Sequence, residues 1–391
     1  QTAPAPVIIA KGIARIMRTA GASVAMQEDV AHSHRVSRQK MLALINILGL
    51  SIGLACFTLF LLYAVHEFSY DRIHKNSASI YRVYEWWNFN AERSGSEPSS
   101  ITPLGPAMKN DLPDVKEFVR FQGGTETIVR VGDKTQRLEF SFADPQIFNV
   151  FTFPLISGDA VSSLQNTHNI VLTKEKALQL FGNTNVVGQP LEIKINNQYE
   201  TFIVGAVAEN IPTNSSIRFD MLGGMNYLLN TEHGKQSSQS WNMTIGISVF
   251  VQLNPGSTLA NDKAKLAAFR AKYYPDQKEN LIKEKLWNGK GELPSGYGLQ
   301  PLREVHTGVN VDKWASVDPK NIYILIAIAA GVLLMACINF TTLSIGRSAG
   351  RAKEVGVRKV IGGRKKQLIF QFLSESLLLS VFSAVLGMLL A

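Results

Sequence analysis

Cysteines and nucleotide-binding glycine loops are the features that this sequence most clearly lacks. It has two cysteines in 391 residues, Cys56 and Cys337. Both lie in long apolar runs, so they supply neither a disulfide framework nor a cysteine-based metal site. The sequence contains no G-x(4)-G-K-[S/T] and no G-x-G-x-x-G motif, so we expect no bound nucleotide and no other cofactor. No Ser/His/Asp or Cys/His set stands out, and we expect no enzyme activity.

Positive charge is distributed unevenly along the chain. The formal net charge is +9, from 40 Lys and Arg against 31 Asp and Glu. Residues 1–40 carry six basic side chains against two acids, and residues 344–376 carry eight against two, so the remainder sums to −1. A nucleic-acid binder spreads its basic residues over a folded face and interleaves them with aromatics. Two basic blocks beside apolar runs instead predict cytoplasmic flanks of membrane spans and no nucleic-acid partner.

Three long apolar runs accompany these blocks. Residues 41–65 and 322–345 contain no formal charge and exceed the roughly 20 residues that cross a hydrocarbon core. A cleavable signal peptide explains the first run poorly, because its apolar part is about 7 to 15 residues long and lies close to the N-terminus. We expect transmembrane helices at 41–65, 321–345 and 368–391, with the third one truncated.

The basic blocks determine the predicted topology, because Lys and Arg accumulate in short cytoplasmic loops. With one crossing on each side of the central region, residues 1–40 and 346–367 face the cytoplasm. Residues 66–320 then lie outside it. The sequence therefore predicts a multi-pass protein in contact with membrane lipid, with a large extracytoplasmic domain.

The central region mixes helix and strand patterns. Alternating runs broken by Gly-Asp and Asn-Asn predict hairpins at 128–140 and 191–207. Residues 169–182 are typical of a strand followed by a helix that Thr173 caps and Gly182 ends. Further predicted elements are a short helix between Pro103 and Pro113, a strand at 247–253 and a helix at 259–274. Without a repeat period, this order favours an α+β domain, with an inner lobe at about 143–280.

Residues 49–53, GLSIG, match the G-x-S-x-G pattern of hydrolase nucleophile elbows. That elbow requires a strand, a strained turn and a helix at the top of a soluble sheet, whereas Ser51 lies in a predicted span. The same residues spell G-x-x-x-G, which lets two membrane helices approach closely. We assign Gly49 and Gly53 to helix packing, with incidental small residues as the alternative.

Residues 66–74, HEFSYDRIH, place His66, Tyr70 and His74 on one stripe of a helix. His and acidic side chains are zinc-ligand types, but the H-E-x-x-H spacing is missing. We therefore expect a polar extension of the first spanning helix and no metal site.

Residues 347–361 predict a basic helix between the second and third spans. Arg351 and Glu354 are spaced i,i+3, and Glu354 and Arg358 are spaced i,i+4 with the acid N-terminal, which is the more favourable order. The following Gly-Gly pair ends the helix. The helix carries a small apolar edge formed by Val357, Val360 and Ile361. From these features it is either a docking element or a solvated loop whose charges fix orientation.

Four motifs occur in order along the chain: INILGLSIGLAC, YDRIHKNSASIYRV, IVLTKEKALQLFG and ACINFTTLSIGRSAGRAKEVGVRKVIGGRKKQLIFQFLSESLL. Together they resemble MacB/FtsX-like ABC transporter permeases, in particular the long duplicated versions common in Bacteroidota. The similarity runs from about Arg38 to Ala391. Residues 1–37, whose pattern suits an interfacial helix or a disordered tail, depart from the family, which enters the first span from a short amphipathic helix.

The resemblance implies a noncatalytic permease subunit in the bacterial inner membrane, with a MacB-like periplasmic core of a porter-like and a second lobe. The segment resembling RAKEVGVRKVIGG forms the cytoplasmic helix that contacts the ABC ATPase subunit. By this resemblance, the ATPase contact comprises Arg351, Glu354, Gly356, Arg358 and Gly362. Further implied partners are a second permease, in a homodimer or heterodimer, a periplasmic adaptor and an outer-membrane channel. The implied activity is export or periplasmic mechanotransmission.

Two other classes of protein share parts of this pattern. A membrane-anchored periplasmic sensor also has a span, an outer domain and a second span, but it would continue into a coiled coil or signalling helix rather than another apolar run. A tethered periplasmic enzyme would need a convergent catalytic set, which the sequence does not offer.

Overall fold

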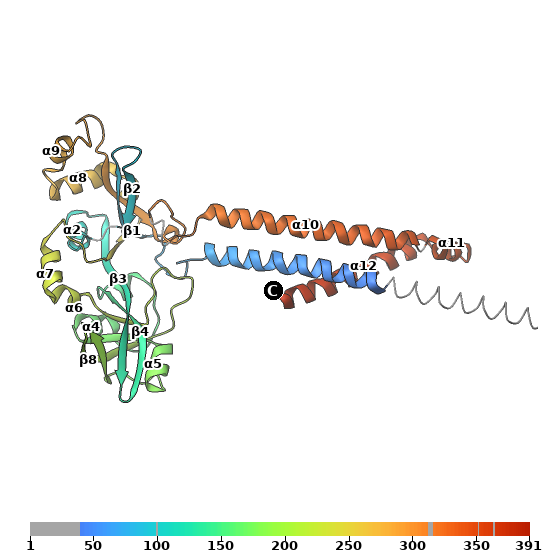
Figure 1. Cartoon of the computed structure of the whole chain (residues 1–391), viewed down its shortest axis with the longest axis horizontal. Helices are drawn as coiled ribbons and strands as arrows, with labels where there is room; N and C mark the ends of the chain where they lie inside the picture. Colours follow the sequence, from blue (N-terminus) through green and yellow to red (C-terminus); the bar gives the residue numbers. More distant parts are fainter. Residues whose placement is uncertain (1–39, 99–100, 312–315, 351, 363) are drawn as a thin grey trace, which may run out of the picture. The chain divides into compact units, whose positions relative to one another are not determined.

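A computed structural model describes residues 40–98, 101–311, 316–350, 352–362 and 364–391 (Figure 1). The segment at residues 1–37, expected as an interfacial helix or a tail, lies outside the described residues. The described chain divides into two compact units. Residues 40–64 and 320–391 form the helical unit, and Val65–Pro319 form the α+β domain.

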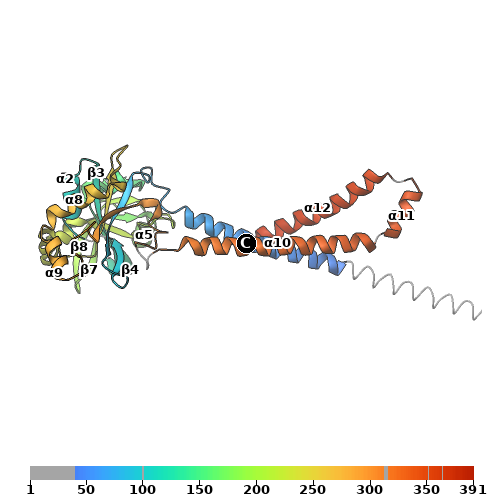
Figure 2. The ribbon, with the colours of Figure 1, turned by 90° about the horizontal axis from the view of Figure 1, so that it is seen from above.

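Figure 2 shows the helical unit, whose described part consists of long apolar helices and a short basic helix. The first helix spans Lys40–Phe68, α10 Pro319–Gly350, α11 Ala352–Val360 and α12 Lys365–Leu390. Within the described residues, three helices are long and apolar enough to cross a membrane: the first helix, α10 and α12. The predicted class of helical membrane spans joined to an α+β domain is confirmed.

The basic helix expected over residues 347–361 is helical on both sides of Arg351, which lies outside the described residues. α10 includes residues up to Gly350, and α11 covers Ala352–Val360. Gly362, with φ 94°, follows α11 in the left-handed conformation that glycine tolerates.

Small residues bring the first helix close to α10 and α12. A Cβ atom added at Gly53 would lie 2.5 Å from the Cβ of Ala336. One added at Gly387 would lie 2.9 Å from the carbonyl oxygen of Ser51. Both distances are shorter than real Cβ contacts, so these positions exclude a larger side chain unless the helices move apart.

The strands of the α+β domain form one mixed sheet within the described residues. They are β1 Ile80–Asn88, β2 Ser94–Pro98, β3 Val115–Val131, β4 Lys134–Ala143, β5 Leu155–Gly158, β6 Asn169–Thr173, β7 Pro190–Ile195, β8 Gln198–Ala208, β9 Met221–Gly224, β10 Ser248–Leu253 and β11 Ser295–Pro301. The strand order is β11-β1-β10-β3-β4-β9-β6-β8-β5, with β2 on β1 and β7 on β3 and β8. Two pairs, β4 with β9 and β6 with β8, are parallel.

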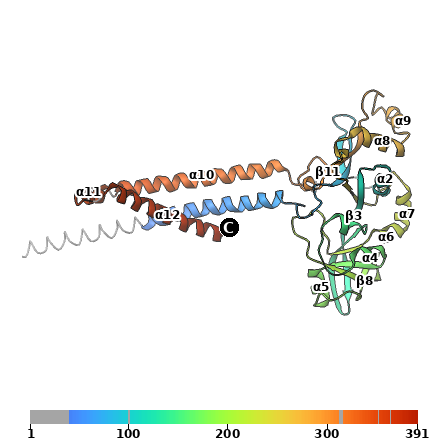
Figure 3. The ribbon, with the colours of Figure 1, turned by 180° about the vertical axis from the view of Figure 1, so that it is seen from behind.

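Short helices pack on this sheet. They are α2 Leu104–Asp111, α3 Ile147–Val150, α4 Ala160–Gln165, α5 Lys174–Phe181, α6 Met225–Asn230, α7 Glu232–Gln239, η1 Leu259–Asn261, α8 Lys263–Tyr273, α9 Gln277–Lys283 and η2 Leu302–Glu304. Figure 3 shows α4, α5 and β8 at one end of the domain and α8, α9 and β11 at the other. The boundaries predicted near residues 143 and 280 for an inner lobe stay a prediction.

The predicted hairpins are confirmed. β3 pairs with β4, and β7 pairs with β8 through Asn196 and Asn197, whose φ angles are 49° and 65°. Positive φ at both central residues is the signature of the type I′ turn that suits the twist of two strands.

The starts of two helices differ from the prediction in detail. Thr173 occupies the cap position of α5, but its side chain makes no capping hydrogen bond. The helical stretch expected over residues 259–274 begins at Leu259 as the 3-10 helix η1 and continues as α8 from Lys263, where the Asp262 carboxylate accepts a capping hydrogen bond from the backbone N–H of Lys265.

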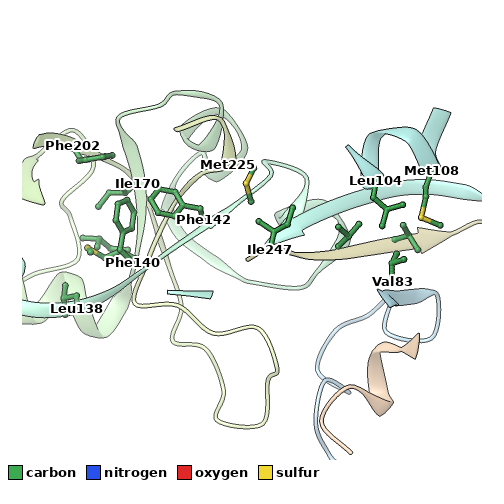
Figure 4. Packing of buried hydrophobic residues seen from close by; sticks show 14 of the residues in the cluster. Val83, Leu104, Met108, Leu138, Phe140, Phe142, Ile170, Phe202, Met225 and Ile247 are labelled. Carbon is green, nitrogen blue, oxygen red and sulfur yellow. The ribbon is translucent and has the colours of Figure 1, made fainter. Parts of the chain in front are cut away.

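The core of the domain covers both faces of the sheet. Along β10, Val249 and Val251 belong to one buried cluster, whereas Phe250 between them belongs to a second cluster. Alternation with period two directs successive side chains to opposite faces. Figure 4 shows Phe140 and Phe202 in the first cluster. The sheet therefore has a buried hydrophobic cluster on each face.

Candidate functional site

Two segments of the α+β domain lie next to its entry and its exit: residues 65–79 and 302–311. We call them the junction. The Glu67 Oε2 and His306 Nε2 atoms lie 2.6 Å apart, and the side chains are only 8% and 14% exposed. The Tyr70 ring stacks on the His306 ring, with centroids 3.4 Å apart and planes 2° from parallel. These contacts fasten the incoming segment to the outgoing one.

Asp71 anchors the incoming segment to the domain. Its buried carboxylate accepts hydrogen bonds from the Ser216 backbone N–H, at 2.8 Å, and from the Ser216 hydroxyl, at 2.6 Å. Burial raises the pKa of Asp71, and the two Ser216 hydrogen bonds oppose that rise. Asp71 has φ 57°, so the helix cannot continue through it. The predicted helical extension over residues 66–74 is correct up to Phe68, where the first helix ends, and wrong beyond it.

His74 is a buried histidine next to Asp71. Its Nδ1 accepts a hydrogen bond of 3.1 Å from the backbone N–H of Thr152, and its Nε2 lies 3.9 Å from Asp71 Oδ1. Phe151 and Phe153 present their ring edges at centroid distances of 5.1 and 5.3 Å. Burial lowers the pKa of His74 to about 4, so the neutral ring is favoured at neutral pH.

The outgoing segment is also tied to the domain. Arg303 donates hydrogen bonds from Nε and Nη2 to the Ser77 hydroxyl, each 3.0 Å long. The guanidinium of buried Arg82 on β1 donates two hydrogen bonds, of 3.0 and 2.8 Å, to Gln300 Oε1 on β11. These contacts tie the described residues of the junction to the domain.

The basic segment after α10 is built differently, since it exposes apolar side chains. Val357, Val360 and Ile361 are 58%, 88% and 79% exposed. Arg358 Nη1 donates a 2.9 Å hydrogen bond to Gln371 Oε1 and so ties α11 to α12. A Cβ added at Gly356 would meet no atom within 4 Å, so the helix surface is open there.

Family models match most of the chain. Residues 43–269 match the MacB-like periplasmic core domain, and residues 325–391 match the FtsX-like permease C-terminal model. The chain belongs to the MacB/FtsX-like family of ABC transporter permeases. The resemblance drawn from the four motifs is thereby confirmed, and the α+β domain is a MacB-like periplasmic core domain.

Two curated proteins resemble this permease. It is 24% identical over 352 residues to the pyoverdine export ATP-binding/permease protein PvdT of Pseudomonas savastanoi pv. phaseolicola, covering 89% of this chain and 48% of PvdT. It is 37% identical over 67 residues to the macrolide export ATP-binding/permease protein MacB of Bdellovibrio bacteriovorus, covering 17% of this chain and 10% of that protein. The permease thus spans about half the length of PvdT.

A solved structure is also similar to the permease. A permease domain from Porphyromonas gingivalis aligns with a TM-score of 0.49 and 20% identity, covering 59% of this chain and 92% of that one.

The predicted ATPase-contact residues of the permease lie in one short stretch. Glu354, Gly356 and Arg358 belong to α11, and Gly362 lies in the turn after it. Arg351 lies outside the described residues. Sequence spacing alone placed these residues together, because they are neighbours along the chain.

The residues assigned to helix packing lie on the first helix of the permease. Gly53 lies against Ala336, and a Cβ added at Gly49 would lie 3.4 Å from Asn339 Nδ2. Ser51 lies between these two glycines in the sequence and is buried in the structure. Its hydroxyl donates a 2.7 Å hydrogen bond to the Ile47 carbonyl. The strand and strained turn of a hydrolase elbow are absent from this described helix.

Sequence reasoning missed the partners of the junction residues. It singled out His66, Tyr70 and His74 as a helical stripe, but it named neither His306 nor Ser216. His306 lies 239 residues from Glu67, and Ser216 lies 145 residues from Asp71. No local sequence pattern signals such pairs. Among the described residues, no group of three or more His, Cys, Asp or Glu side chains is placed to hold a metal ion.

Proposed function

We propose that this permease is a noncatalytic subunit that couples ATP hydrolysis by a separate ABC ATPase to export or periplasmic mechanotransmission in the bacterial inner membrane. The observation that carries the proposal is α11, a basic helix with an exposed apolar edge between two candidate membrane helices. Membership of the chain in a family of ABC transporter permeases supports the proposal.

The ATPase contact would consist of Arg351, Glu354, Gly356, Arg358 and Gly362. Docking would remove the apolar edge of α11 from water. Full burial of one such side chain is worth about 1.5 to 3 kcal/mol, which for three side chains offsets part of the cost of association. The charged residues would then select the partner and the orientation rather than supply most of the affinity.

Force would reach the periplasmic domain through the junction. A displacement of the first helix and α10 moves the domain only if the connecting segments are stiff. The buried Glu67 and His306 pair, the Asp71 carboxylate and the Arg303 contact supply that stiffness. The domain would alternate between two arrangements that the nucleotide state of the ATPase biases.

The complete transporter would contain two permeases, as a homodimer or a heterodimer, with a periplasmic adaptor and an outer-membrane channel as further partners. The name of PvdT, a pyoverdine export ATP-binding/permease protein, supports export as the class of activity.

The test is the charge reversal Glu354→Lys. The permease is purified with its ATPase, and complex formation and coupled transport are compared with those of the wild type. We expect the variant to bind the ATPase at least about tenfold more weakly, with an unchanged melting temperature, because the substitution reverses the charge of one side chain in the proposed contact. The matched control is Glu232→Lys, the same charge reversal at an exposed position on α7. Unchanged complex formation and transport in Glu354→Lys would refute the proposed contact.

A further inference from the structure

A cleft of about 400 Å³ lies between α11 and the start of α12. Its polar lining consists of Arg358, Arg364, Gln367 and Gln371, and its apolar lining includes Ile361 and Leu368. Both arginines are exposed, and Arg358 is held toward α12 by its hydrogen bond to Gln371. The cleft therefore presents two guanidinium groups beside apolar carbon.

The stretch that lines this cleft carries positive charge, and Glu354 and Glu375 lie directly on either side of it. From Val355 to Ser374 the sequence has five basic residues, Arg358, Lys359, Arg364, Lys365 and Lys366, and no Asp or Glu. Guanidinium groups donate paired hydrogen bonds to phosphate oxygens, and these charge-assisted bonds are about twice as strong as neutral ones. An anionic phosphate group is the ligand that this charge complements.

An apolar stripe of α12 continues from the cleft. A second hollow of about 460 Å³, lined by Lys366, Gln367, Phe370 and Gln371, shares both glutamines with the cleft. Phe370, Leu373 and Leu377 follow at helical spacing and are 75%, 64% and 64% exposed. A ligand that occupies both features has an anionic head and a long apolar tail.

We propose that this cleft binds an anionic phospholipid of the cytoplasmic leaflet. Its headgroup phosphate contacts the guanidinium groups of Arg358 and Arg364, and an acyl chain lies along Phe370 and Leu373. Free phosphate shares the headgroup chemistry, but it leaves the apolar stripe unused. Basic pockets beside membrane helices on the cytoplasmic side bind anionic headgroups by the same physics.

Arg364→Gln tests this site, since Arg364 lies outside the predicted ATPase contact. Native mass spectrometry of the whole chain in detergent would measure binding of dioleoylphosphatidylglycerol, dioleoylphosphatidylcholine and inorganic phosphate. We expect the wild type to prefer phosphatidylglycerol to phosphatidylcholine by about tenfold and Arg364→Gln to lose most of that preference. Lys359→Gln is the matched control, because it removes one charge from the same segment at a residue outside the lining of the cleft.

Three results would overturn the proposal. Equal losses in Arg364→Gln and Lys359→Gln would mean diffuse charge rather than a built cleft. Inorganic phosphate that competes with phosphatidylglycerol at equal concentration would mean an anion site without a role for the acyl chain. Weaker ATPase binding by Arg364→Gln, with unchanged phosphatidylglycerol binding, would assign the cleft to the ATPase instead.

Discussion

The geometry of the junction predicts how much the Glu67 and His306 pair contributes to the stability of the periplasmic domain. The atoms lie 2.6 Å apart between largely buried side chains, and a hydrogen bond to a charged group contributes about 1.5 to 3 kcal/mol to stability. His306→Gln also removes the stacked contact with Tyr70, worth about 0.5 to 1.5 kcal/mol. We therefore expect Glu67→Gln to cost about 2 kcal/mol and His306→Gln about 3 kcal/mol.

A double-mutant cycle isolates the pair. Because the two single variants break the same hydrogen bond, the double variant should cost about 1 to 3 kcal/mol less than the sum of the singles. For a domain of this size each kcal/mol lowers the melting temperature by about 2 to 4 °C.

Intrinsic fluorescence measures this unfolding selectively. All five tryptophans lie between residues 65 and 319, so heating the purified permease in detergent reports on the periplasmic domain. If the cost of the double variant equals the sum of the two single costs within about 0.5 kcal/mol, the reasoning is refuted. Glu67 and His306 would then act independently and would not hold the two segments together.

Two further predictions concern His74 and Gly53. The pKa of His74 falls from 6.5 to about 4 on folding, so its stabilising contribution is complete above pH 6.5 and is lost as the pH falls towards 4. Between pH 7 and pH 5 this loss of stability is about 2 kcal/mol. His74→Asn cannot titrate, so in this variant the loss should disappear from the pH dependence of fluorescence-detected unfolding. The same pH dependence in the variant and the wild type would contradict the role of His74. Gly53→Val should destabilise the helical unit by about 1 to 3 kcal/mol, because the new Cβ meets Ala336 at 2.5 Å. Gly331→Val is its control, since a Cβ there meets no atom within 4 Å, and equal loss of helical circular dichroism on heating in both variants would contradict the packing argument.

Local patterns predicted the elements whose causes are local. The uncharged runs located the apolar helices, and the Asn-Asn pair at 196–197 located the β7–β8 hairpin, because positive φ at both residues is needed there. The helix expected through Tyr70 to His74 failed for a tertiary reason. Asp71 adopts φ 57° while its carboxylate binds Ser216, a residue far away in the sequence.

One part of the candidate site could be predicted from the sequence, and another part could not. The basic segment at 352–362 depends on neighbouring residues, so the sequence indicated it. The pairing of Glu67 with His306 depends on how the sheet brings β1 next to β11, which local patterns do not contain.

The proposed coupling requires the basic segment and the periplasmic domain to face opposite sides of the membrane. The decisive measurement is labelling of single cysteines by a membrane-impermeant maleimide in intact spheroplasts. Lys235→Cys on α7 and Lys359→Cys on α11 would each be made in a chain whose Cys56 and Cys337 are replaced by serine. We predict that position 235 is labelled in intact spheroplasts and that position 359 is labelled only after the membrane is permeabilised. Labelling of position 359 from outside would contradict the topology and, with it, the proposed coupling to the ATPase.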